Sequence, residues 1–204
     1  MPSTASGRFN RLDKHVGHLI AIHRKIQGGA GRRHRQEAIH RAGVVLTVAA
    51  WEAYVEEVVR ETAIAMAPQF FQATVGERQT HSLMVAGVSA RAKSFNTPDY
   101  KKVRNLFKLI KFDITGAWSW HAPNRNWNHA VMKKKLNEWL QIRHCVAHGA
   151  DLPKSITWII GLSGEARLTL NHLLECRRFF AKLVKQSDSA IRAHAIAVLG
   201  TQPW

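Results

Sequence analysis

Apolar side chains recur with the spacing of helices along most of the chain. Val44, Val48, Trp51 and Val55 illustrate the pattern, because side chains three and four residues apart share one face of a helix. The pattern predicts helices over residues 10–27, 34–67, 79–92, 129–148 and 171–197, and another that begins at 97–99. Four of these are long, and long connections join them, so the expected fold is an all-α, up-and-down helical bundle.

Glycine and proline mark the expected ends of these helices. The run Gly28-Gly29-Ala30-Gly31 closes the first helix, and Pro68 stops the second. Thr97-Pro98-Asp99 is a start signal, with a hydroxyl N-cap and proline at the first helical position. Gly149 stands just past the helix that ends near residue 148, where glycine is favoured because it tolerates a left-handed backbone.

Two segments lack the helical pattern. The stretch that contains Trp118, Trp120 and Trp127 is polar and rich in rings, which predicts an ordered loop. These rings either stack on unpaired bases of a nucleic acid or pack against the bundle. Further along, the apolar runs 156–160 and 166–170 flank a connection with two glycines, so we expect one small β-hairpin there.

The charge of the chain indicates a class of binding partner. The chain has 30 basic and 14 acidic residues, a net charge of +16, which favours binding to a polyanion. Residues 1–41 carry nine basic and two acidic side chains, and residues 91–112 carry seven basic and one acidic. Lys133-Lys134-Lys135 forms another basic cluster. We therefore expect contact with nucleic acid, and within 91–112 the candidate RNA-binding residues are Lys101, Lys102 and Lys108.

Other features narrow the class of protein. No apolar run approaches the roughly 18–20 residues that cross a bilayer, and residues 1–7 lack a signal-peptide pattern. We therefore expect no membrane association and a cytoplasmic location. Cys145 and Cys176 form no paired motif and are expected to be reduced thiols within helices. No cofactor is expected.

The most informative stretch is Arg143-His144-Cys145-Val146-Ala147-His148-Gly149, at the end of a predicted helix. Side chains at 144 and 148 share a face, and the long side chain of Arg143 reaches towards His148. The last turn of a helix presents unpaired carbonyls, which favour a protonated imidazole at His148. A cationic histidine beside an arginine favours binding of an anion, and a phosphodiester fits the charge of the chain.

This pairing is suited to cleavage of RNA. Histidine transfers protons near neutral pH, and arginine binds phosphoryl oxygens and stabilises the charge that develops in the transition state. The ribose 2′-hydroxyl can attack the adjacent phosphorus and leave a cyclic phosphate, without a metal. By spacing alone, however, a helix-capping role is favoured over catalysis. Zinc binding by His144 and His148 is a further alternative. The sequence between them lacks the glutamate of the His-Glu-x-x-His pattern, however, and no third ligand is evident.

The segment from Arg143 to Gly149 resembles the Arg-polar-x-x-x-His motif of HEPN domains, and Ala50–Glu57 resembles the aromatic and acidic signature on their second helix. The resemblance implies a bundle that dimerises and cuts RNA in a composite cleft. It implies catalytic positions for Arg143 and His148, a supporting polar position for His144, and an acid at Glu52 that orients the arginine. Glu56, one turn further on, is an alternative acid.

The resemblance covers residues 35–198. Within HEPN domains, the chain is particularly similar to the families of bacterial toxin and defence systems. Residues 1–34 would be a basic helix and glycine-rich loop packed on or appended to this domain, and 199–204 a tail. The resemblance implies RNA and a second copy of the chain as partners, with a cognate antitoxin or sensor protein as a further candidate.

Three classes of function follow from these observations. The first is a metal-independent endoribonuclease of a toxin or phage-defence system, and the second is a non-catalytic HEPN module that binds RNA or a protein. The third, a basic helical DNA-binding protein, would need a helix that reads duplex DNA, and no clear helix-turn-helix pattern is present.

Overall fold

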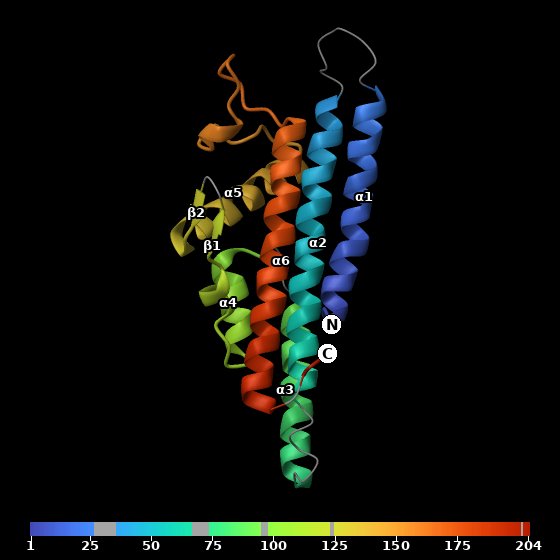
Figure 1. Cartoon of the computed structure of the whole chain (residues 1–204), viewed down its shortest axis with the longest axis vertical. Coiled ribbons are helices and arrows are strands. Elements are labelled where there is room, and N and C mark those ends of the chain that lie inside the picture. The colour runs from blue at the N-terminus through green and yellow to red at the C-terminus, as the bar shows by residue number, and fades with distance from the viewer. Residues whose placement is uncertain (27–35, 67–73, 95–97, 123–124, 201) are drawn as a thin grey trace.

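Long helices lying side by side form the body of the protein (Figure 1). The computed structural model describes residues 1–204 except 27–35, 67–73, 95–97, 123–124 and 201. The helices are α1 (Thr4–Ile26), α2 (Glu37–Ala65), α3 (Val75–Lys93), α4 (Tyr100–Lys108), α5 (His129–Ala147) and α6 (Leu170–Leu199), and the strands are β1 (Trp120–Ala122) and β2 (Arg125–Trp127). The prediction of an all-α bundle is confirmed. The predicted glycine-rich end of the first helix, Pro68 and Thr97 lie outside the described residues.

The core lies around α2, which packs against α1, α3, α5 and α6. The ring of Trp51 on this helix is fully buried and lies 5.6 Å from the Tyr54 ring and 5.9 Å from the rings of Trp118 and Phe180. Such offset and edge-on aromatic contacts stabilise a core beyond the area they bury. Trp118 therefore packs in the core, and its indole N–H donates to Ser187 Oγ at 2.8 Å.

Helix α1 is fixed to the bundle by polar contacts as well as by its apolar face. Glu61 of α2 accepts hydrogen bonds from the first backbone N–H groups of α1, at Thr4 and Ala5. Arg177 of α6 makes a bidentate pair with Asp13, both contacts 2.7 Å. Charged groups held in this forked geometry fix orientation as well as adding energy. The basic first helix thus packs on α2 and α6.

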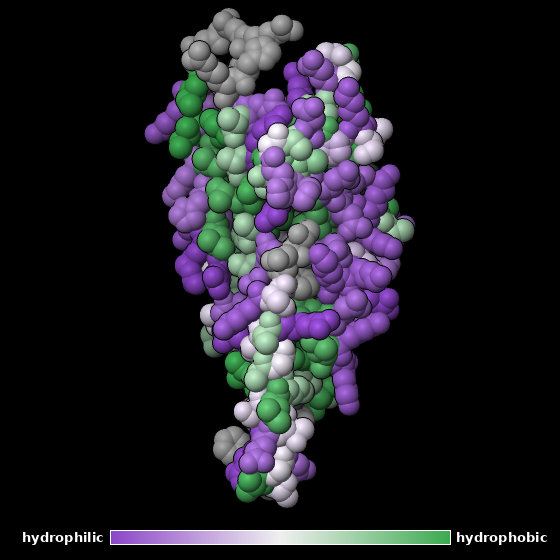
Figure 2. Space-filling view, turned by 180° about the vertical axis from the view of Figure 1, so that it is seen from behind, coloured by the Kyte–Doolittle hydropathy of each residue, from purple (hydrophilic) through white to green (hydrophobic). Residues whose placement is uncertain are grey.

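Helix α3 is less enclosed than the others. It extends beyond the ends of its neighbours (Figure 1), and its buried residues are Val88 and Ala92. Thr74 and Glu77 form a capping box that satisfies backbone groups at its start. From behind, hydrophilic side chains cover much of the upper and middle surface, and the narrow end that α3 forms is mixed in hydropathy (Figure 2).

The helix predicted to begin at 97–99 begins at Tyr100, and its N-cap is Asp99 rather than Thr97. The Asp99 carboxylate accepts a hydrogen bond from the backbone N–H of Lys102 at 2.8 Å. A carboxylate satisfies a free N–H and also interacts favourably with the positive end of the helix dipole. The start signal was therefore correct in type and misplaced by two residues.

The small hairpin forms elsewhere than predicted. It joins β1 and β2, where Trp120 pairs with Trp127 and their rings stack 5.6 Å apart. A cross-strand aromatic pair of this kind stabilises a short hairpin. Within 156–170 the described backbone instead has a 3-10 turn at Thr157–Ile159 and a single bridge between Ile160 and Ala166. A strand would place Ile156 and Ile159 on opposite faces, whereas the turn buries both.

Candidate functional site

The C-terminal turn of α5 presents the predicted motif at the surface. His148 is the C-cap, and Gly149 follows with φ of 66°, the left-handed conformation expected of a glycine at this position. The N–H of Ala150 donates to Cys145 O at 2.9 Å, and the N–H of Gly149 donates to Val146 O at 3.3 Å. These two bonds satisfy carbonyls of the last turn and direct the chain away from the helix axis, so that His148 lies at its exposed end.

His144 and His148 form a pair of exposed imidazoles. Their ring centroids are 4.3 Å apart and the rings are tilted by 51°. One turn of helix separates the two residues, which explains why the rings meet. Two imidazoles at this distance can both reach one small anion or one phosphodiester group. The structure thus brings together two of the predicted site residues.

Arg143 lies on the side of α5 that faces α2. Its guanidinium Nη2 is 3.6 Å from Glu52 Oε2, and the side chains of Arg143 and Glu52 are 26% and 18% exposed. This separation is longer than a hydrogen bond, so the pair is chiefly electrostatic. Among the described residues, no acceptor bonds to the buried Nε of Arg143. The guanidinium is therefore held near Glu52, and the Arg143 side chain keeps some exposure.

Glu56, the alternative acid, has other neighbours. Burial raises the pKa of the Glu56 carboxyl, the negative charge of Glu52 raises it further, and the positive charge of Arg8 lowers it. Glu57, the next residue, accepts a hydrogen bond from Arg8 at 2.7 Å, which is the main reason that its own pKa is lowered. The ion pair with Arg143 is made by Glu52, the acid that the resemblance indicated.

The three predicted RNA-binding lysines are exposed on α4, away from the 143–149 turn in sequence. Lys102 lies 3.9 Å from the Asp99 carboxylate. Lys108 is at the opposite end of this helix from Lys101. Lys101 lines a cavity of about 370 Å³ between α4 and α5, together with Lys133 and other residues of α5.

The basic run at 133–135 is not a single surface cluster. Lys133 and Lys134 are exposed, but Lys135 is only 3% exposed. Its ammonium is 2.9 Å from Glu175 Oε1 and 3.2 Å from the centre of the Trp158 ring. Lys135 thus belongs to an ion pair in which the lysine is buried and Glu175 is partly exposed, and it is not part of an RNA-binding surface.

The tryptophan-rich segment packs against the bundle. Trp120 and Trp127 lie 6.4 Å and 5.6 Å from the Phe179 ring of α6, measured between ring centroids. Trp118 is buried. Of the two interpretations of these rings, the contacts therefore favour packing over stacking on bases.

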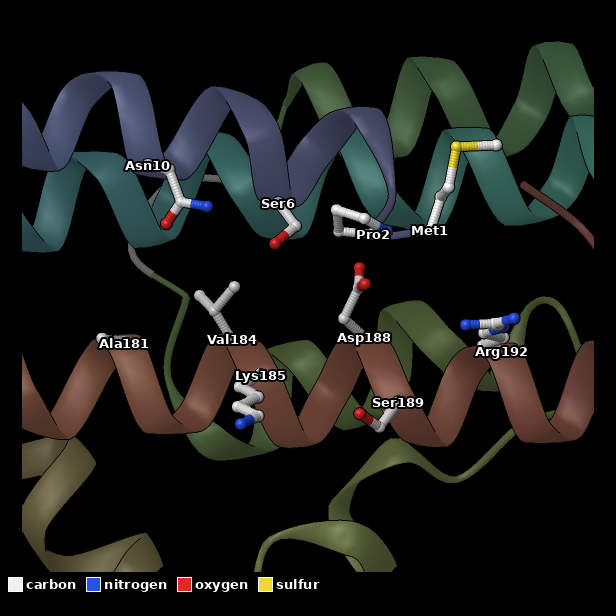
Figure 3. Close-up of a pocket in the computed structure, with 10 residues that line it drawn as sticks. All are labelled: Met1, Pro2, Ser6, Asn10, Ala181, Val184, Lys185, Asp188, Ser189 and Arg192. Atoms are coloured by element: carbon white, nitrogen blue, oxygen red, sulfur yellow. The ribbon is translucent and has the colours of Figure 1, made fainter.

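A larger cavity, of about 560 Å³, lies between the start of α1 and α6 (Figure 3). Asp188 points from α6 into this space, where Ser6 and Pro2 lie opposite. The Asp188 carboxylate accepts hydrogen bonds from the backbone N–H and the hydroxyl of Ser3. Asp188 therefore attaches the start of the chain to α6. Neither Arg143 nor His148 lines this cavity.

Metal-binding clusters and membrane spans are both absent from the part of the chain that the structure describes. Its residues include no group of three histidine, cysteine, aspartate or glutamate side chains placed to hold a metal ion. None of the described helices is both long and apolar enough to cross a membrane.

Sequence reasoning missed Asn137, which lines the cavity beside Lys101 and Lys133. The available signal was its spacing, because Lys133, Asn137 and His144 recur at four and seven residues and share one face of α5. Nothing in the sequence indicated that α4 would close the other side of this face.

Comparison with known proteins identifies the family of the chain. No curated protein and no solved structure gave a significant match. The RiboL-PSP-HEPN family, in contrast, matches residues 9–193, which span α1 to α6 and include Glu52, Arg143 and His148. This match covers most of the chain. The protein therefore belongs to the RiboL-PSP-HEPN family of HEPN domains.

Proposed function

We propose that the protein is a metal-independent endoribonuclease that cuts RNA at the C-terminal turn of α5. Membership of a HEPN family indicates a nuclease-type function related to RNA. The observation that carries the finer proposal is the arrangement at the end of α5: Glu52 lies beside the guanidinium of Arg143, and two exposed imidazoles lie on the same turn. A cationic fork beside two proton carriers suits a phosphodiester.

In the proposed reaction, the ribose 2′-oxygen attacks the adjacent phosphorus while His148 accepts the hydroxyl proton. The bond from 2′-oxygen to phosphorus forms, the bond from phosphorus to 5′-oxygen breaks, and the 5′-oxygen takes up the proton that His148 accepted, so that His148 returns to its neutral form. Arg143 binds the phosphoryl oxygens and stabilises the charge that develops on them in the transition state. His144 supports the second proton transfer, because its ring lies 4.3 Å from that of His148. The products are a 2′,3′-cyclic phosphate and a 5′-hydroxyl.

A second copy of the chain would complete the cleft. Each chain supplies one Arg143 and one His148, both at an exposed helix end that a symmetric partner can approach. We propose a homodimer whose two motifs face one shared RNA strand, in a toxin or phage-defence system with an antitoxin or sensor protein as regulator. Light scattering at micromolar concentration should give the mass of a dimer.

The test is cleavage of a single-stranded RNA oligonucleotide by the purified protein in excess chelator. We expect a 2′,3′-cyclic phosphate end by mass spectrometry and no cleavage of DNA of the same sequence, which lacks the 2′-hydroxyl. His148→Ala should lower kcat by a factor of about 10²–10⁴ and leave RNA affinity within a few-fold. Arg143→Lys should retain little activity, because an ammonium cannot bind two phosphoryl oxygens in a fork.

The matched control is His121→Ala, which removes an exposed imidazole from β1 and should cleave as the wild type does. Cleavage that survives His148→Ala, or that needs a divalent ion, would contradict the mechanism. RNA binding without any cleavage would instead favour the non-catalytic HEPN module.

A further inference from the structure

One face of α5 carries a continuous line of polar side chains that leads away from the cleavage motif. From His148 this line passes through His144 and Gln141 to Asn137 and Lys133, and all five residues are exposed. Residues separated by three, four and seven positions share a helix face, so these side chains form one stripe along the axis. An RNA strand bound at His148 and running along α5 would meet this stripe.

The far end of the stripe opens into the cavity between α4 and α5. This cavity has a volume of about 370 Å³ and is lined by Asp99, Lys101, Lys133, Asn137 and Leu140. This volume lies within the range of about 300–1,000 Å³ of small-ligand sites. Three of the five lining residues, Lys101, Lys133 and Asn137, are exposed, so the cavity is open to solvent and suits one nucleotide of a passing strand rather than a folded partner.

The charges of the lining residues favour an anionic ligand. Lys101 and Lys133 approach the cavity from two different helices, and both are exposed. The single carboxylate, that of Asp99, already accepts the backbone N–H of Lys102 at 2.8 Å and lies 3.9 Å from the Lys102 ammonium. Its charge is therefore partly balanced within α4, and the two lysines are left to attract a phosphate.

The other walls suit the base and sugar. Leu140 is 4% exposed and provides an apolar surface. Asn137 offers an amide that both donates and accepts, which is the pattern needed for the edge of a base. The wall on the α4 side is fixed in place, because the buried Tyr100 hydrogen-bonds to His129 and its ring lies 5.6 Å from the Lys133 ammonium.

We propose that this cavity binds a second nucleotide of the RNA strand that is cut at His148, with its phosphate between Lys101 and Lys133 and its base beside Asn137. This proposal rests on the proposed ribonuclease function. The helix rises about 1.5 Å per residue, so Asn137 and His148 are separated by about 16 Å along the axis. At about 3.4 Å per stacked nucleotide, this distance corresponds to about five nucleotides. The cavity would therefore give the enzyme a preference for longer strands over a dinucleotide.

The experiment compares Lys133→Gln and Asn137→Ala with Lys134→Gln. Lys134 is the neighbour of Lys133, is 79% exposed, pairs with Glu138 and does not line the cavity, so its replacement removes the same charge from outside the site. All three changes lie at exposed helix positions, and circular dichroism should show an unchanged fold. Two readouts are needed. The first is binding of a labelled ten-nucleotide RNA to each variant made in the His148→Ala background. The second is cleavage of that RNA and of a dinucleotide by each variant with His148 intact.

We expect Lys133→Gln and Asn137→Ala to weaken binding of the ten-nucleotide RNA by about ten-fold, the effect of losing a hydrogen bond to a charged or base group. KM for this RNA should rise similarly, kcat should stay unchanged, and cleavage of the dinucleotide should not be affected. Lys134→Gln should stay within about two-fold of the parent, since a single exposed charge adds little.

The outcomes separate this proposal from the proposed function. The proposed nucleotide site is overturned if the cavity variants bind the RNA as tightly as Lys134→Gln does. It is also overturned if they cleave the dinucleotide as slowly, relative to the parent, as they cleave the RNA. If the parent protein cuts nothing, the proposed function fails, and binding alone still decides the cavity. As a further check from the other helix, Lys101→Gln should reproduce the effect of Lys133→Gln, and an unchanged affinity would overturn the placement of the phosphate.

Discussion

Replacement of Glu52 by glutamine should slow RNA cleavage about ten-fold while leaving the protein folded. Glu52 is a positioning residue in the proposed mechanism, because it contacts Arg143 and is not proposed to contact the RNA. Glutamine keeps the size of the side chain and removes the negative charge that holds the guanidinium. Without that charge, Arg143 can adopt rotamers that do not point at the phosphoryl group, and transition-state stabilisation is lost.

The magnitude follows from the geometry of the pair. Two unit charges 3.6 Å apart attract by about 4–5 kcal/mol at an effective dielectric constant of about 20. Both side chains keep some exposure, 26% and 18%, so solvent screening reduces the net value to about 1–2 kcal/mol. Because each 1.36 kcal/mol of barrier is a factor of ten in rate, full use of this energy for orientation gives a loss of about five- to thirty-fold.

Stability should change much less than rate. The charge of Glu52 also raises the pKa of Glu56, which shows that the two carboxylates repel each other. Glu52→Gln removes this repulsion together with the attraction to Arg143, so the free energy of unfolding should change by less than about 1 kcal/mol. A thermal or urea unfolding curve close to that of the wild type would confirm that the loss of rate is not a loss of folded protein.

A double-mutant cycle distinguishes positioning from a general structural effect. If Glu52 acts only through Arg143, the double variant Glu52→Gln/Arg143→Gln should cleave no more slowly than Arg143→Gln alone. Glu56→Gln is the matched control one turn further along α2, and it should leave kcat within about two-fold of the wild type. Multiplicative losses in the double variant, or equal losses from Glu52→Gln and Glu56→Gln, would refute the reasoning.

Two further predictions concern stability and binding. Burial and the charge of Glu52 raise the pKa of Glu56 above its ordinary 4.5, so the ionised carboxylate destabilises the folded state. Glu56→Gln should therefore raise the urea midpoint at pH 7, and this gain should fade as pH falls through the raised pKa of the folded state and be lost below the ordinary 4.5. An equal gain at pH 7 and below 4.5 would exclude the carboxylate as its source. Replacing Lys101, Lys102 and Lys108 together with glutamine should flatten the dependence of RNA affinity on salt by about 0.7 for each phosphate that is no longer neutralised, measured by fluorescence anisotropy, whereas an unchanged slope would place the RNA elsewhere.

The helices could be predicted because their signal is local. An apolar stripe such as Val44, Val48 and Val55 determines both that a helix forms and which face is buried, and all three side chains are buried. The hairpin was misplaced because its stability comes from a contact across strands, between Trp120 and Trp127, rather than from alternation within one strand.

The site, like the fold, has a part that local sequence predicts and a part that depends on contacts between distant segments. Arg143 and His148 lie in one short motif at a helix end, and the sequence is sufficient to place them together. Glu52 lies on another helix, and in the sequence only the resemblance to HEPN domains connects it with Arg143. The cavity at Asn137 could not be predicted, because it exists only where α4 packs beside α5, and no pattern in the sequence specifies that pairing.

The basic run at 133–135 shows why net charge alone does not locate an RNA-binding surface. Successive residues of a helix point in directions about 100° apart, so three consecutive lysines must face three different surroundings. Lys133 lines the cavity, Lys134 is in solvent near Glu138, and Lys135 is buried and paired with Glu175. A buried lysine that is already paired contributes no counterion release when RNA binds, since RNA cannot reach its charge. The number of phosphates that the protein neutralises should therefore be set by which helix faces the lysines occupy, and it should be smaller than the net charge of +16 suggests.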